Sequence, residues 1–403
     1  MGENLITASI DKFIDAGTLA GAATLVWQDG NVIQAGGVGW RNIERKLPME
    51  RDTLFRIASM TKPITSTAAL MLFEKGRFAL NDPITRWAPE FAQMRVLRSP
   101  VGELNQTDPA ARPITFEDLL THRSGLTYAD FHAGPIAQAY KEALGGDIDS
   151  AVLPDEWIAR LAALPLIDQP GAAFHYGHST DLLGFIIARI EDAPLDDILK
   201  RRIFVPLGMN DTGFTVPAEK QPRRAAPHGF DDAGRLCVRH TGPGESFLSE
   251  RPEGMAYVSG GQGLWSTLDD YLTFARMFVN AGAVDDCQLL QPKTFRQMVT
   301  NYLSEDQRAR AGSLLNDGHG FGLGVAMVLD PVKAGPLPCG GGVGAVGWPG
   351  AFGGWWRADP NTHSVLIFLA HNMVELEQYY EGIGLGVYEA ITQFQAQASS
   401  LLR

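Results

Sequence analysis

The sequence predicts a mixed α/β protein, with strands near both ends of the chain and a mostly helical middle. Two short apolar strands, 22–27 and 32–35, flank Asp29-Gly30, a dipeptide typical of tight β-hairpins. A third strand, 364–370, reads Ser-Val-Leu-Ile-Phe-Leu-Ala and is the clearest strand in the chain. Strands at both ends with helices between them indicate one domain built from the two termini, into which a helical segment is inserted.

We therefore expect residues 1–80 and 250–403 to form a discontinuous α/β domain, and residues 81–249 to form a mostly helical lobe. A first helix is predicted over 5–16, because apolar residues recur at helical spacing and Gly17 follows as a C-cap. A last helix is predicted over 374–397. Inside the lobe, helical spacing is found at 116–122, 157–164 and 181–190. The active site is expected in the cleft between the two parts, where small-molecule sites are common.

The composition is that of an ordinary globular protein with an excess of negative charge. Of the 403 residues, 45% are hydrophobic and 20% are charged, and the formal net charge is -12. This charge would repel nucleic acid and an anionic membrane surface, so we expect neither as a partner. No stretch reaches the roughly 18 consecutive apolar residues of a membrane-spanning helix. The expected partner is a small molecule, and nothing in the sequence predicts an oligomeric state.

Cysteine usage and the N-terminus both indicate a cytoplasmic protein. Cys237, Cys287 and Cys339 form no C-x-x-C pair and are odd in number, which argues against a disulfide framework and favours a reducing compartment. The first residues lack the basic region and the long apolar region of a secretory signal.

The strongest catalytic signal is Ser59-Met60-Thr61-Lys62, set directly before an apolar helical run. Residues three apart share a face of a helix, so the Lys62 amine can reach the Ser59 hydroxyl. A lysine acts as a base only where burial or nearby cations lower its pKa from about 10.4. The alternative is a helix N-cap serine with a solvated lysine. Residues 63–73 are small or apolar nearly all round the helix, which favours a buried site.

Two further stretches carry candidate residues. Tyr176 lies in a loop-like segment, 174–179, and beside a lysine cation its phenol would lose a proton more easily. The alternative is a half-buried tyrosine whose hydroxyl is simply hydrogen-bonded. The glycine-rich segment 347–354 would let a substrate lie along the backbone of an edge strand. The alternative there is an edge hairpin with no catalytic role.

These three stretches, in this order, resemble the serine β-lactamase and penicillin-binding-protein superfamily, and in particular the class C β-lactamase-like family VIII carboxylesterases. The superfamily carries Ser-x-x-Lys, then Tyr-x-Asn or Ser-x-Asn, then Lys-Thr-Gly on a strand. Further segments that look like landmarks of this group are 81–84, 119–126, 206–209 and 260–267, so the resemblance covers about residues 8–395. It implies a β-lactamase/DD-peptidase-like fold, with an antiparallel sheet flanked by the terminal helices.

The resemblance also implies a role for each motif residue. Ser59 matches the acylated nucleophile, Lys62 its activating partner and Tyr176 the tyrosine of the second motif. By the same resemblance, the oxyanion hole would be formed by the backbone N–H groups of Ser59 and Ala351. Pro349 has no N–H to donate, but Ala351 has one.

Three positions are expected to contact substrate, and two of them depart from the lactam-acting relatives. His178 stands where those relatives have Asn, and Trp348 replaces the lysine of the third motif, with Gly350 completing Trp-Pro-Gly. Without that lysine the site loses its attraction for a substrate carboxylate and gains an apolar wall. The pattern therefore favours a neutral ester over a penicillin.

The predicted function is a serine carboxylesterase that hydrolyses short-chain esters through an acyl-enzyme, with weak activity on β-lactams or cephalosporin esters. One alternative is an acyltransferase that uses the same acyl-enzyme. Others are a β-lactamase or DD-peptidase, and a non-catalytic binding protein that keeps the fold.

We expect no cofactor and no metal. Residues 342–347 spell G-x-G-x-x-G, but Pro336 and Pro338 precede them where a dinucleotide-binding unit needs a strand. His175 and His178 could ligate a metal in principle, but two imidazoles without an acidic partner pattern do not make a site.

Overall fold

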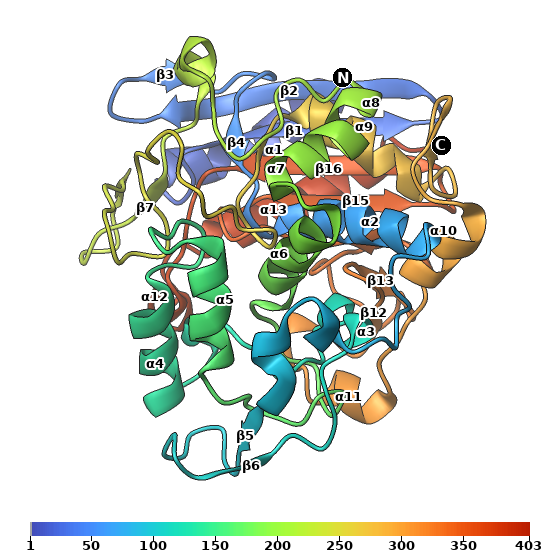
Figure 1. Cartoon of the computed structure of the whole chain (residues 1–403). Helices are drawn as coiled ribbons and strands as arrows, with labels where there is room; N and C mark the ends of the chain where they lie inside the picture. Colours follow the sequence, from blue (N-terminus) through green and yellow to red (C-terminus); the bar gives the residue numbers. More distant parts are fainter. Residues whose placement is uncertain (1) are drawn as a thin grey trace.

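The computed structural model describes residues 2–403 and has a mixed α/β fold, as predicted. Its centre is an eight-stranded antiparallel sheet in the order β12-β13-β14-β15-β16-β1-β2-β3. In Figure 1 the blue N-terminal strands lie beside the red C-terminal strands. The strands are β1 (Gly21–Gln28), β2 (Asn31–Asn42), β3 (Leu47–Pro48), β12 (His319–Phe321), β13 (Ala326–Val328), β14 (Val346–Gly347), β15 (Trp355–Asp359) and β16 (Ser364–Ala370).

The two ends of the chain meet where β1 pairs with β16. The pairing runs antiparallel from Ala22 opposite Ala370 to Gln28 opposite Ser364. The predicted hairpin is confirmed, because β1 and β2 are joined at Asp29 and Gly30, whose φ angles are 48° and 85°. Positive φ at both central residues gives a turn whose twist matches that of the strands.

Strand β16 is apolar from Val365 to Ala370 because both faces of the sheet are covered. Leu366 and Phe368 pack on one side with the terminal helices α1 (Gly2–Asp15) and α13 (Gly386–Ser399). Val365, Ile367 and Leu369 point to the other side and join the main core. That core includes residues of α2 (Thr61–Glu74), α6 (Ser179–Glu191) and α9 (Leu268–Ala275). Alternate residues thus bury against two layers of helices, which explains the unbroken apolar run.

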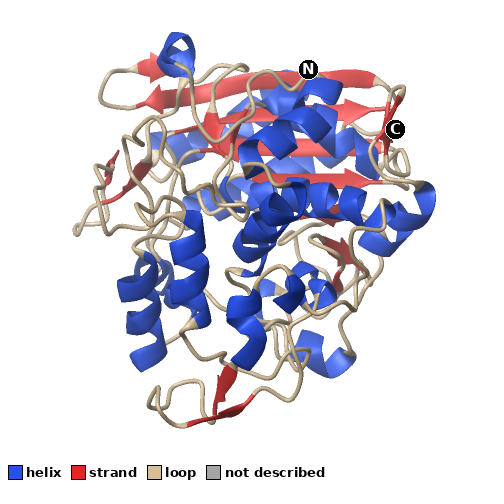
Figure 2. Ribbon diagram, in the orientation of Figure 1, coloured by secondary structure: helices blue, strands red, loops and turns tan. Residues whose placement is uncertain are grey.

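Most helices of the middle segment lie below the sheet in the view of Figure 2. This segment also holds two short hairpins, β5 (Arg95–Leu97) with β6 (Thr107–Pro109), and β7 (His228–Phe230) with β8 (Leu236–Val238). The helices are α3 (Phe116–Leu120), α4 (Pro135–Leu144), α5 (Pro154–Ala162), α6, α7 (Leu195–Leu199) and α8 (Val205–Leu207). Within residues 2–403, no helix is both long and apolar enough to cross a membrane.

The prediction of a single last helix over 374–397 was wrong. The structure has a short α12 (Leu376–Tyr380) and a separate α13. Gly382 and Gly384 lie between them with φ angles of 81° and 74°, which a right-handed helix cannot contain. A Cβ at Gly384 would also lie 2.5 Å from the ring of Phe230, so glycine is needed there for space as well.

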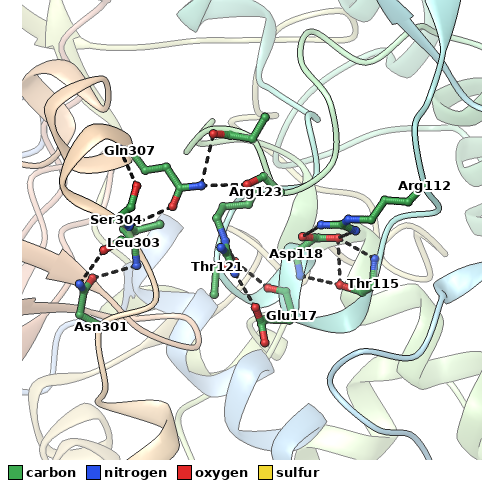
Figure 3. A network of polar contacts seen from close by, with 12 residues as sticks. Arg112, Thr115, Glu117, Asp118, Thr121, Arg123, Asn301, Leu303, Ser304 and Gln307 are labelled. Atoms are coloured by element: carbon green, nitrogen blue, oxygen red, sulfur yellow. Dashed lines mark hydrogen bonds and ion pairs between the residues drawn. The ribbon is translucent and has the colours of Figure 1, made fainter.

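The segment that follows α3 is held in place by the polar network of Figure 3. Thr115 and Asp118 form a reciprocal capping box at the start of α3. At its end, Arg123 donates to Thr121 Oγ1 at 2.9 Å and to Glu117 Oε1 at 2.6 Å. These contacts fix the chain at 121–123, and the residues directly after it reach the site described next.

Candidate active site

Ser59 and Lys62 lie together at the start of α2. Ser59 belongs to a 3₁₀ turn, Ala58–Met60, and Lys62 is the second residue of the α-helix. Lys62 Nζ is 3.3 Å from Ser59 Oγ, and the two residues are 1% and 5% exposed. The spacing argument from the sequence took both residues as helical, whereas the structure has a tighter 3₁₀ turn at Ser59. Ala58 in this turn has a φ of 43°, a conformation that costs a non-glycine residue energy.

The surroundings of Lys62 lower its pKa. Its Nζ donates to the Tyr128 hydroxyl at 3.1 Å and to the Gly261 carbonyl at 3.0 Å. Burial lowers the pKa of Lys62 to about 7, although the charges of Asp181 and Asp147 act in the opposite direction. A substantial fraction of Lys62 is therefore a neutral amine near pH 7, which is the form that can accept a proton.

Tyr176 lies on the other side of Lys62. The ammonium nitrogen is 4.6 Å from the centre of the Tyr176 ring. Trp348 Nε1 donates a hydrogen bond of 2.9 Å to the Tyr176 hydroxyl. The expectation that the lysine eases ionisation of this phenol was wrong. Burial raises the pKa of Tyr176 and outweighs the lowering effect of hydrogen bonds to Ser59 and Trp348, so the phenol keeps its proton at neutral pH.

The turn that carries Ala351 packs against the nucleophile's segment. Gly350 N donates to Gly354 O at 2.7 Å, which closes the turn. A Cβ on Gly350 would lie 2.4 Å from the carbonyl oxygen of Ile57, so only glycine allows this close approach. Within the described residues 2–403, the Ala351 N–H makes no hydrogen bond to the protein. It is available as a donor beside the turn that holds Ser59.

Trp348 is almost completely buried and is part of an aromatic cluster. Its ring is 5.0 Å from that of Tyr176 and 5.2 Å, edge to face, from that of Phe321. Packing on two sides and a hydrogen bond on the third fix its orientation. Trp348 thus orients the Tyr176 hydroxyl. The substrate contact expected of Trp348 stays a prediction.

His178 does not face an open site, because its side chain is completely buried. Its Nδ1 is 3.1 Å from Asp181 Oδ2, and its Nε2 is 3.4 Å from Asp147 Oδ1. The statement that this histidine has no acidic partner was wrong: Asp181 follows one helical turn later. Substrate contact at His178 stays a prediction, and this burial does not favour it.

Sequence reasoning gave no site role to three residues that line the site, namely Tyr128, Asp181 and Gly261. Tyr128 donates from its hydroxyl to Asp181 Oδ2 at 3.2 Å while it accepts from Lys62. Asp181 Oδ1 accepts from Gly261 N at 3.0 Å and from the hydroxyl of Ser259. Tyr128 follows the landmark segment 119–126 by two residues, and Gly261 lies inside the landmark 260–267. Both segments were therefore recognised as typical of the superfamily, but no role was predicted for Tyr128 or Gly261.

Comparison with known proteins agrees with this fold and geometry. Residues 6–382 match the model of the family described as Beta-lactamase, and the chain belongs to this family. It is 46% identical over 371 residues to Protein Rv1367c of Mycobacterium tuberculosis strain H37Rv, covering 92% of this chain and 90% of the relative. It is 31% identical over 382 residues to Esterase EstB of Burkholderia gladioli, again covering 92% and 90%.

A solved structure extends the same comparison. EstCE1, described as a hydrolase with promiscuous acyltransferase activity, superposes with a TM-score of 0.78 at 25% identity and covers 98% of both chains. Given its family and its relatives, the protein is a serine hydrolase that acts on ester bonds.

Proposed function

We propose that the protein hydrolyses short-chain esters through an acyl-enzyme formed on Ser59. The observation that carries this proposal is the buried Lys62 amine, 3.3 Å from Ser59 Oγ and with a pKa of about 7. A lysine in this state is a base of the right strength for a serine hydroxyl at neutral pH. The substrate would bind where the predicted α/β domain, which supplies Ser59 and Trp348, meets the predicted helical lobe, which supplies Tyr176.

In acylation, Ser59 Oγ attacks the ester carbonyl carbon and passes its proton to the neutral Lys62 amine. The backbone N–H groups of Ser59 and Ala351 hold the negative oxygen of the tetrahedral intermediate. As the bond to the alcohol oxygen breaks, the protonated Tyr176 gives its proton to the leaving oxygen. The Lys62 ammonium then returns a proton to Tyr176. Lys62 ends the step neutral, and the acyl group is on Ser59.

In deacylation the same groups work in the reverse direction. Water attacks the acyl carbon, its proton passes through Tyr176 and Lys62, and Ser59 Oγ leaves as a hydroxyl. The acid is released and the starting state is restored. An alcohol in place of water would give acyl transfer. The description of EstCE1 favours this as the second candidate function.

The preference for a neutral ester rests on Trp348. A buried indole occupies the position of the third-motif lysine, so no cation is offered there to a substrate carboxylate. We propose short-chain esters as the main substrates, with weak activity on β-lactams or cephalosporin esters. The β-lactamase and DD-peptidase alternatives would need another cation to bind the substrate's acid group.

Hydrolysis of p-nitrophenyl butyrate by the wild type, Ser59→Ala and Ser66→Ala tests the proposal. Ser66 is a matched control, because it is a buried serine of α2, the helix that directly follows the Ser59 turn, and it loses the same atom. We expect activity and labelling by a fluorophosphonate probe to vanish in Ser59→Ala and to persist in Ser66→Ala. Retained activity in Ser59→Ala would contradict the proposal. Product analysis with added alcohol separates hydrolysis from acyl transfer.

A further inference from the structure

A line of buried polar groups extends from Lys62 away from Ser59. The Tyr128 hydroxyl bridges Lys62 Nζ and Asp181 Oδ2 at 3.1 and 3.2 Å. Asp181 contacts His178 Nδ1 at 3.1 Å, and His178 Nε2 lies 3.4 Å from Asp147. Asp181 and His178 are completely inaccessible, whereas the side chain of Asp147 is 19% exposed. The line thus runs from the candidate base to the edge of the protein.

The position of His178 suits a positively charged imidazole. Two carboxylates face its two nitrogens: Asp181 lies in the first turn of α6, directly after His178, and Asp147 lies in the loop after α4. Tyr140 of α4 stacks on its ring at 5.9 Å, and the rings of Tyr128 and Trp157 meet it edge-on at 4.4 and 5.4 Å. Burial acts to lower the pKa of His178, but the carboxylates of Asp147 and Asp181 beside its two ring nitrogens outweigh it and the pKa is raised.

Asp181 is fixed as a carboxylate by its own partners. Burial acts to raise its pKa, but the hydrogen bond and charge of His178, with help from Lys62 and Ser259, hold it below its usual value. The other titratable groups around Lys62 are neutral at pH 7. Burial raises the pKa of Tyr128 and Tyr176 and, together with the charge of Lys62, lowers that of His122. The charges that act on Lys62 are therefore those of Asp181 and Asp147, and His178 pairs with both of these carboxylates.

We infer that His178 is a positioning residue that keeps Lys62 uncharged, because its positive charge offsets the two carboxylates that would otherwise hold Lys62 as an ammonium. Without His178, two negative charges would face Lys62 through Tyr128 and the loop at 147. With it, their sum is a single negative charge. This inference rests on the proposed function, in which the neutral Lys62 amine activates Ser59.

Removing the positive charge of His178 and removing the negative charge of Asp181 should shift the pH dependence of the Ser59 reaction in opposite directions. The acid limb is the pH range in which the rate of the Ser59 reaction rises as the Lys62 ammonium loses its proton. His178→Asn removes the positive charge, stabilises the Lys62 ammonium and shifts this limb to higher pH. Asp181→Asn removes a negative charge and shifts it to lower pH. A shift of one pH unit upward lowers the rate on the acid limb about tenfold. A merely structural role would lower the rate without moving the limb in opposite directions.

The experiment is the rate of fluorophosphonate labelling of Ser59 between pH 5 and pH 9. His175→Asn is the matched control, because His175 also pairs with an aspartate, Asp168 at 3.3 Å, but makes no contact with Lys62 within the described part of the chain. We expect an upward shift for His178→Asn, a downward shift for Asp181→Asn and no shift for His175→Asn.

An unmoved or lowered limb in His178→Asn would overturn the inference. If that variant does not fold, His178→Gln tests the same loss of charge with a longer side chain, and the same outcomes apply. If the wild-type protein is not labelled at any pH, the proposed function fails, which is distinguishable from failure of the inference.

Discussion

The core around β16 and the region behind α2 that contains Lys62, Asp181 and His178 are both buried, but the first consists of apolar side chains and the second includes charged ones. Around β16 the buried side chains are apolar, and Phe368 packs on the terminal helix α13 through Phe394 at 5.8 Å. Behind α2 the buried side chains include Lys62, Asp181 and His178. Apolar burial stabilises the fold directly, whereas each buried charge costs desolvation energy that its partners must offset. The apolar core around β16 is therefore distinct from the region that holds the candidate catalytic residues.

Ser59→Ala is the variant for which we expect the largest effect on activity. It removes one hydroxyl from the region that holds the candidate catalytic residues, and we expect the rate of ester hydrolysis to fall by at least about 10⁴-fold. The free energy of unfolding should change little, because no apolar packing is lost. Activity is measured with p-nitrophenyl butyrate and stability by urea unfolding. A large loss of stability together with activity would mean that the two regions are not separate.

Tyr176→Phe removes the proposed proton donor and keeps the ring. We expect a loss of about 10²–10⁴-fold in kcat, the usual contribution of a general acid. The aromatic contacts with Trp348 stay, so thermal stability should be close to that of the wild type. A pH–rate profile that Tyr176→Phe leaves unchanged in height and shape would contradict a proton-transfer role.

Phe368→Ala tests the other region. Loss of a fully buried phenylalanine side chain should reduce the free energy of unfolding by about 3–5 kcal/mol. The kcat of the folded enzyme should stay near that of the wild type, since Phe368 packs on the face of the sheet that the terminal helices α1 and α13 cover. The control is Val332→Ala at a surface position that is 93% exposed, where we expect less than about 0.5 kcal/mol. Equal losses in the two variants would contradict the assignment of the core.

Trp348→Phe gives the smallest effect. It removes the 2.9 Å hydrogen bond to the Tyr176 hydroxyl and leaves most of the ring packing. The net value of such a bond is about 0.5–1.5 kcal/mol, so we expect a loss of about 2- to 13-fold in kcat/KM. Steady-state kinetics on neutral esters measures it. A gain in activity toward anionic esters, with none lost on neutral ones, would show instead that Trp348 acts on substrate charge alone.

Local patterns predicted the elements but not the long-range contacts. The hairpin at Asp29-Gly30 and the strand 364–370 carry their own signals in turn chemistry and apolar runs. The Ser59–Lys62 pair has a spacing that any helical turn brings together. The contact of Lys62 with Tyr128 joins two elements that are distant in sequence, and no local pattern encodes it. Asp147 was missed for a similar reason, since it approaches His178 from another loop. Asp181 is only three residues from His178, so local spacing could have found it.

The central claim is that Lys62 is the buried base of Ser59, with a pKa of about 7. The most direct test is the pH dependence of kcat/KM for p-nitrophenyl butyrate in the wild type. As the ammonium loses its proton with rising pH, the rate should increase and reach half of its maximum near pH 7. A rate that is half-maximal only near pH 10, the ordinary range of a solvated lysine, would contradict the account, as would a rate that is flat from pH 5 to pH 9.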